Sequence, residues 1–180
     1  MTYICILRGI NVSGKNLIKM AALKEAFEKA GFKNIRIYIQ SGNVVFEDKS
    51  KNEEDLKKKI EKLIADTYEL KVPVLVRNLE YWNWVIENNP FISQQDIDPS
   101  RLHVTFLSEE PENEKLEKIK DLTLDNDRFI VIGKTVYLHT PNGYGNSKIN
   151  NSFFENKLKV TATTRNWKTV NELKRISDSI

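Results

Sequence analysis

The sequence predicts an α+β fold made of two ferredoxin-like units in tandem, each with the element order β-α-β-β-α-β and an extra helix at its end. Apolar residues alternate in some short segments and recur every three or four residues in others, and this order of segments occurs twice in 180 residues. The order matches the split β-α-β arrangement of ferredoxin-like folds. Because residue identity between the halves is not visible, the repeat is one of element order. We predict a first unit at residues 1–90, a linker at 91–100 and a second unit at 101–180.

The first half alternates strand and helix patterns. Ile35, Ile37 and Ile39 alternate with polar residues, which is typical of a half-buried strand, and Gly31 ends the helical pattern before it. Asn52 is a good N-cap for the next helix. We predict strands at 3–8, 35–40, 44–47 and 72–77, and helices at 19–30, 52–68 and about 79–88.

The second half repeats this order after residues 89–100, which contain two prolines and no periodicity. Gly133-Lys134 predicts a two-residue hairpin turn. We predict strands at 101–107, 128–132, 135–139 and, very short, 159–162, and helices at 112–122, 148–158 and 165–176.

Composition excludes several classes of protein. The single cysteine rules out an internal disulfide, and one cysteine with two histidines argues against a Cys/His zinc site, so we expect neither a metal nor another cofactor. No apolar run reaches the roughly 18 residues of a membrane-spanning helix, and the N-terminus is a strand pattern rather than a signal peptide. We expect a cytoplasmic protein.

The net charge of +3 is unevenly distributed. Residues 1–50 carry 8 Lys/Arg and 4 Asp/Glu, residues 51–129 carry 12 and 18, and residues 130–180 carry 8 and 3. If the two basic ends fold together, they form a positive surface for an anionic partner. Solvated acidic helices in the middle are the alternative explanation.

The polar stretch from Leu7 to Asn16 follows the first strand and precedes the first helix. Its glycines and cations, Arg8, Gly9, Gly14 and Lys15, are the chemistry of a loop that binds an anion with backbone N–H groups and cationic side chains. The spacing approaches the phosphate-binding pattern G-x-x-x-x-G-K-[ST], but Asn16 replaces the hydroxyl that holds Mg²⁺. We therefore favour a structural loop or a weaker anion site.

Three further polar stretches have two interpretations each. The Gln40–Asn43 segment is a hairpin turn whose amides could also contact a base or sugar. The stretch at 142–148 places two glycines, Ser147 and Lys148 before a helix, as either an anion nest or a helix entry. The 161–168 stretch offers hydroxyl N-caps and puts Arg165 and Lys168 in a first helical turn, where cations oppose the helix dipole and so favour an anionic partner.

Signals for catalysis and for an RNA platform are weak. His103 and His139 lie on strands predicted to be antiparallel neighbours and could face each other, but no positioned carboxylate or thiol accompanies them. RNA-recognition domains stack bases on aromatics of the central strands, whereas the third strand here offers Phe46, which alternation points inward.

Several motifs together resemble a known family. They are L-R-G-I-N-V-x-G-K-N at 7–16, Y-I-Q-S-G-N-V-V-F at 38–46, S-K at 147–148 and A-T-x-R-N-W-x-T-V at 162–170. The sequence is similar in these stretches to the bacterial domain of unknown function 1697 family. The resemblance implies a soluble cytoplasmic protein of this length, and it supplies no activity.

We therefore expect binding of an anionic ligand, a nucleic acid or nucleotide, in a basic cleft formed by glycine-bearing loops. The alternatives are an enzyme acting on a small phosphorylated substrate, with Arg8, Lys15 and Arg165 as clamps, and a protein–protein module that exposes Tyr81, Trp82 and Trp84. Catalytic residues and oligomeric state are not determined by the sequence. The predicted ligand-binding residues are Arg8, Gly9, Asn11, Gly14, Lys15, Asn16, Gln40, Ser41, Asn43, Ser147, Lys148, Arg165, Asn166 and Lys168.

Overall fold

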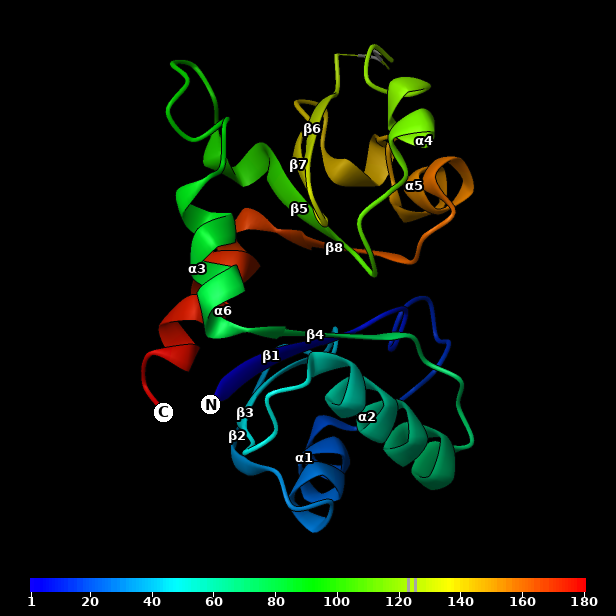
Figure 1. Ribbon diagram of the computed structural model, residues 1–180, viewed down its shortest axis with the longest axis vertical. Coiled ribbons are helices and arrows are strands. Elements are labelled where there is room, and N and C mark those ends of the chain that lie inside the picture. The colour runs from blue at the N-terminus through cyan, green and yellow to red at the C-terminus, as the bar shows by residue number, and fades with distance from the viewer. Residues whose placement is uncertain (123, 125) are drawn as a thin grey trace. The chain divides into compact units, whose positions relative to one another are not determined.

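The computed structural model describes residues 1–122, 124 and 126–180, and the chain forms two compact units (Figure 1). The first unit comprises Met1–Trp84 and Glu172–Ile180, and the second comprises Val85–Asn171. The boundaries between the units fall inside two helices, α3 (Leu79–Glu87) and α6 (Trp167–Ser177).

The first unit contains a four-stranded antiparallel sheet in the order β2-β3-β1-β4. Two helices, α1 and α2, cover one face of this sheet (Figure 1). The elements are β1 (Thr2–Leu7), α1 (Met20–Lys29), β2 (Lys33–Tyr38), β3 (Asn43–Glu47), α2 (Glu53–Tyr68) and β4 (Val74–Asn78).

Alternation along the strands decides what each sheet face presents. On the helix-covered face, Tyr3, Cys5 and Leu7 of β1 join Val44 and Phe46 of β3 in the core, so the inward orientation expected of Phe46 is observed. The intervening residues point to the opposite face, where the central strands present the buried aliphatic side chains Ile4, Ile6 and Val45. Exposed aromatics of the RNA-recognition kind are therefore missing from these central positions.

The second unit has the same strand order, β6-β7-β5-β8, again with antiparallel pairing. Its core lies between the sheet and helices α4 and α5, and contains Leu107, Val136, Leu138, Phe154 and Leu158. The predicted α+β fold with duplicated ferredoxin-like units is confirmed. The elements are β5 (Leu102–Leu107), α4 (Asn113–Glu117), β6 (Arg128–Ile132), β7 (Thr135–His139), α5 (Asn151–Leu158) and β8 (Ala162–Asn166), with short 3₁₀ turns at Pro99–Arg101 and Tyr144–Asn146.

Several element boundaries in the second unit differ from the predicted ones. Helix α4 ends at Glu117 rather than Leu122. Helix α5 begins at Asn151, because the Asn150 side chain accepts a hydrogen bond from the Phe153 N–H and so caps the helix there.

Among the described residues, no helix is long and apolar enough to span a membrane.

The last strand is longer and later than predicted. Lys159 has a left-handed conformation that ends α5, and β8 then pairs with β5 from Ala162 to Asn166. Arg165 therefore lies in a strand and not in a first helical turn, which Lys168 occupies. The cap of α6 is the Asn166 side chain, which accepts from the Thr169 N–H at 2.7 Å, and not a threonine hydroxyl.

The structure also reveals residue identity between the halves that the sequence did not. Arg77-Asn78 ends β4, and Arg165-Asn166 ends β8. The Asn78 side chain caps α3 by accepting from the Tyr81 N–H at 2.8 Å, as Asn166 does for α6. In each unit, an Arg-Asn pair thus ends the fourth strand, and its asparagine caps the helix that follows.

We expect Asn166→Ala to lower the free energy of unfolding by about 0.5–2 kcal/mol, because it removes this cap acceptor. Asn166→Asp keeps the acceptor and should lose little. Denaturation in urea measures the change, with exposed Asn156→Ala on α5 as a control. An Asn166→Ala protein as stable as the control would contradict the capping role.

Candidate functional site

The predicted anion loop begins where β1 ends, and backbone bonds fix it to two neighbouring segments. The Leu7 N–H donates to the Gly42 carbonyl at 2.8 Å, and the Arg8 N–H donates to the Pro73 carbonyl at 3.0 Å. The loop 8–19, the turn 39–43 and the segment 71–73 therefore meet at one end of the first sheet. We call these three segments the loop end of the first unit.

The Asn11 side chain connects two backbone segments of this loop end through hydrogen bonds. Its amide nitrogen donates to the carbonyls of Ile18 (3.0 Å) and Gln40 (2.8 Å), and its amide oxygen accepts from the Ile18 N–H (2.8 Å). The Asn16 amide donates to the Gly9 carbonyl at 3.0 Å. Because these amides bond to the chain itself, Asn11 and Asn16 hold the loop together.

The tip of the loop is a hairpin-like turn and not a phosphate-binding loop. The Lys15 N–H donates to the Val12 carbonyl at 2.9 Å, and the two central residues, Ser13 and Gly14, have positive φ values of 49° and 74°. This is a type I′ turn. A phosphate-binding loop runs directly into a helix, whereas α1 begins at Met20, five residues after Lys15. The 9–16 segment therefore resembles the phosphate-binding pattern in sequence only, because it forms a turn that does not lead directly into a helix.

The Gln40–Asn43 turn packs tightly against the loop. A Cβ atom at Gly42 would lie 2.7 Å from both the Ile10 Cδ1 and the Leu7 Cβ, and its φ is +74°. The fully buried Asn43 amide donates to the Tyr38 carbonyl (3.1 Å) and to the Ser41 hydroxyl (2.9 Å). Gly42, Asn43 and Ser41 thus shape the turn, while Gln40 remains exposed.

The exposed side chains of this loop end include several cations. Lys15, Lys19 and Lys71 are exposed and Arg8 is half-buried, and the three segments contain no Asp or Glu.

Three aliphatic side chains in the same segments are also exposed, by 54% for Val12, 70% for Leu17 and 49% for Ile39. Ile39 has a φ of +52°, an unfavourable conformation for a β-branched residue. Strain of this kind often accompanies functional positions. The polar motifs drew attention to this region of the sequence, and the exposed aliphatic residues were missed because the strand pattern predicted a half-buried Ile39.

In the second unit, the glycine-rich loop between β7 and α5 is mainly a connection. Gly143, with φ +88°, precedes the 3₁₀ turn Tyr144–Asn146. The Ser147 hydroxyl accepts from the Ile149 N–H at 3.1 Å and does not cap α5, which begins later. Lys148 is exposed but lies three residues before the helix. The predicted nest at a helix N-terminus is therefore not formed by these residues.

Arg165 and Asn166 have local partners on β8. The Arg165 guanidinium donates to the Thr164 carbonyl at 2.9 Å, as the Arg77 guanidinium does to the Val76 carbonyl at 2.8 Å. Asn166 caps α6, and Lys168 remains exposed in its first turn. Each unit therefore contains two of the four predicted segments, and most of their polar groups stabilise local structure.

His103 and His139 do not face each other. The strands β5 and β7 are neighbours, but His103 lies opposite Leu138 and His139 opposite Leu102, so the two imidazoles point to opposite sheet faces. The His103 ring stacks on Tyr144 at 4.9 Å. His139 lies beside the Arg128 guanidinium, at 3.3 Å. A two-histidine acid–base or metal site is therefore excluded.

Burial lowers the pKa of His103 below its ordinary value of 6.5, although a hydrogen bond with the Arg101 backbone opposes the shift. Partial burial, together with the Arg128 charge, lowers the pKa of His139. Both imidazoles are therefore neutral near pH 7.

Because His103 has a lower pKa folded than unfolded, the unfolded chain binds the proton first as the pH falls through 6.5. We expect the free energy of unfolding to decrease below pH 6.5, and His103→Phe, which keeps an aromatic ring against Tyr144, to reduce that slope by at most about 1.4 kcal/mol per pH unit. Denaturation from pH 7.5 to about 5 measures this difference. An NMR titration that places the His103 pKa above 6.5 would contradict it.

We expect Gly42→Ala to destabilise the first unit by about 1–3 kcal/mol more than Gly14→Ala, because the added methyl group must displace Ile10 and Leu7. Gly14 is the matched control, since it has the same φ of +74° with no atom within 4 Å of an added Cβ. Urea denaturation of both variants measures the difference. Equal losses would show that the conformation of glycine, and not close packing, limits this turn.

Comparisons with known proteins agree with these observations. A solved structure titled as the conserved bacterial protein SP0830 from Streptococcus pneumoniae superimposes with a TM-score of 0.77 and 24% identity, over 98% of each chain, and so has the same fold. No functionally curated protein matches the sequence. The family model described as "Protein of unknown function (DUF1697)" matches residues 1–137, which confirms the resemblance seen in the sequence motifs. The chain belongs to the DUF1697 family.

Proposed function

We propose that the loop end of the first unit binds single-stranded nucleic acid. The observation that carries this proposal is its charge: Arg8, Lys15, Lys19 and Lys71 gather on three segments that contain no carboxylate side chain. The nearby Glu61 carboxylate, which lines the same hollow as Lys71, accepts a hydrogen bond from the Val74 N–H at 3.2 Å, so cations remain in excess at the loop end. An excess of cations attracts the phosphate backbone and makes binding dependent on salt.

The exposure of the loop end favours a polymer over a small phosphorylated molecule. Small-molecule sites enclose most of their ligand, whereas Val12 and Leu17 are 54% and 70% exposed and Lys15 is exposed at the end of a turn. An extended chain can lie across such a surface and contact several cations at once. An enzyme that acts on a small phosphorylated substrate is therefore the weaker alternative.

The aliphatic side chains favour a single strand over a duplex. Bases in a duplex are stacked and paired, so their faces are inaccessible to side chains, whereas unpaired bases can pack against apolar groups. Val12, Leu17 and Ile39 offer such groups beside the cations. Because they are not aromatic, they provide little stacking, and we expect weak sequence preference and an affinity dominated by phosphate contacts.

The test is fluorescence anisotropy with a labelled single-stranded oligonucleotide at a series of salt concentrations. Four phosphate contacts on a single strand predict a slope of log K against log salt of about −3, which is about a 50-fold loss of affinity between 50 and 200 mM salt. The double variant Lys15→Ala/Lys19→Ala should reduce the slope by about 1–2. A duplex of the same sequence should bind more weakly.

Lys118→Ala is the matched control, because Lys118 is exposed in the second unit and lies beside Glu114, at 2.7 Å. It should bind as the unaltered protein does. The proposal is wrong if the oligonucleotide produces no anisotropy change at 50 mM salt, or if Lys118→Ala weakens binding as much as the Lys15/Lys19 pair.

A further inference from the structure

A short segment of the second unit, residues 89–94, forms a turn through its own hydrogen bonds. The Asn89 side chain accepts from the Phe91 N–H at 3.0 Å. The Gln94 N–H donates to the Phe91 carbonyl at 3.2 Å, and the Gln94 side-chain amide donates to the Pro90 carbonyl at 2.9 Å. The Phe91 side chain is buried, whereas Gln94 is exposed. The segment therefore keeps its local shape by itself, and its attachment to the sheet depends on other contacts.

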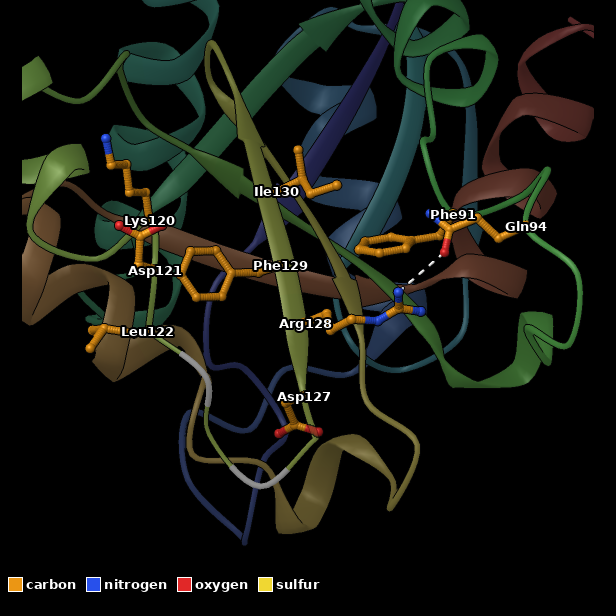
Figure 2. A pocket seen from close by; sticks show the side chains of 9 residues that line it. All are labelled: Phe91, Gln94, Lys120, Asp121, Leu122, Asp127, Arg128, Phe129 and Ile130. Atoms are coloured by element: carbon orange, nitrogen blue, oxygen red, sulfur yellow. Dashed lines mark hydrogen bonds between the residues drawn. The ribbon is translucent and has the colours of Figure 1, made fainter.

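The guanidinium group of Arg128, at the start of β6, makes several of these contacts (Figure 2). It donates to the Gln94 side-chain oxygen at 3.2 Å, and its carbon lies 5.2 Å from the centre of the Phe91 ring. Its Nη2 atom lies 3.3 Å from Nδ1 of His139, the residue opposite Arg128 on β7. The His139 ring is 6.1 Å from the Phe91 ring. We call these four side chains the Arg128 cluster.

The contact between Arg128 and His139 fixes the protonation state of the imidazole. A guanidinium group has N–H donors and no acceptor, so Nδ1 of His139 must accept the hydrogen bond and carries no hydrogen. The proton of the neutral ring is then on Nε2. A second proton would bind to Nδ1, and two cationic donors would face each other. The hydrogen bond therefore exists only while His139 is neutral.

The other groups around His139 do not compensate for this conflict. Leu102, opposite His139 on β5, carries no charge. The carboxylates of Asp98 and Asp127 attract an imidazolium, but burial and the Arg128 charge outweigh them and lower the pKa of His139 below 6.5. Movement of Arg128 away from the ring would remove part of this opposition. Because proton uptake and that movement favour each other, a falling pH favours the arrangement without the contact.

We propose that the Arg128 cluster is a pH-sensitive switch, which holds the 89–94 segment on the sheet while His139 is neutral and releases the segment when His139 is protonated. The guanidinium that must leave the imidazolium is the group that bonds Gln94 and covers the Phe91 ring. It cannot move away without losing those contacts. Phe91 and Gln94 also line a hollow of about 400 Å³, so release of the segment opens this hollow.

A fluorine label on Phe91 tests the attachment. We would incorporate 4-fluorophenylalanine at position 91 of the full chain and record ¹⁹F spectra from pH 7.5 to 5. The resonance should move toward its value in the urea-unfolded chain, with a midpoint that coincides with the titration of the His139 ring. Since one proton is taken up, the ratio of released to attached segment should rise by at most about tenfold per pH unit. An unchanged circular dichroism spectrum separates release from unfolding.

Substitutions identify the group responsible. His139→Gln offers a side-chain oxygen that accepts from Arg128 and does not titrate, so its ¹⁹F resonance should not move with pH. Arg128→Met, at an exposed position, removes the charge but keeps an apolar chain beside Phe91, and its resonance should also be independent of pH. His103→Phe is the matched control, because it removes the histidine on the opposite sheet face, and the movement should remain.

Two results would overturn the proposal. One is a Phe91 resonance that stays in place while the His139 ring titrates, since Arg128 would then move without the segment. The other is an equal movement in the His139→Gln protein. If His139→Gln does not fold, the same movement in Arg128→Met has that meaning.

Discussion

In each unit, two backbone hydrogen bonds tie the end of the first strand to two neighbouring connections, and we call this arrangement the closure. The candidate site depends on it. In the first unit, the Leu7 N–H donates to the turn between β2 and β3, and the Arg8 N–H donates to the residue before β4. In the second unit, the Leu107 N–H donates to Lys134 and the Ser108 N–H to Thr161, which are the equivalent positions. Three connections of each unit thus meet at one end of its sheet. The loop end of the first unit carries its cations together because of this closure.

The polar residues of the family motifs mostly maintain that closure. Asn11 joins the loop to the turn, Asn43 shapes the turn from inside, and Gly42 lets the two approach within contact distance. A buried or half-buried amide that loses its partners is costly, so these residues are needed for the local fold whatever the protein binds. The functional surface is then made of the side chains that the closure leaves outside, the cations and the exposed aliphatic groups.

The two units share side-chain hydrogen bonds at their fourth strands and at the starts of the helices that follow, and these features do not belong to the candidate site. Each has an arginine that covers a carbonyl of its own edge strand, a glutamate on a helix that receives an edge N–H, and an asparagine that caps the next helix. The units differ in the register of their remaining edge strands, which is irregular for β2 and regular for β6.

The sequence by itself determined the fold class, the order of elements and most of their boundaries, because hydrophobic periodicity and capping residues act over a few neighbours. It also located the polar loops. It misplaced β8 and hence Arg165, since Thr163 and Thr164 gain their strand conformation from pairing with β5, which is distant in sequence.

For the polar residues of the loops and for the two histidines, the direction of the side chain was decided by tertiary structure. The sequence suggests that Asn11 and Asn16 bind a ligand. In the fold their amides instead donate to backbone carbonyls, that of Gln40 for Asn11 and that of Gly9 for Asn16, which lie 29 and 7 positions away along the chain. The opposite orientations of His103 and His139 likewise depend on a one-residue difference in strand register. Hydrogen-bond partners and register are set by contacts between distant segments, so residue type and local spacing cannot reveal them.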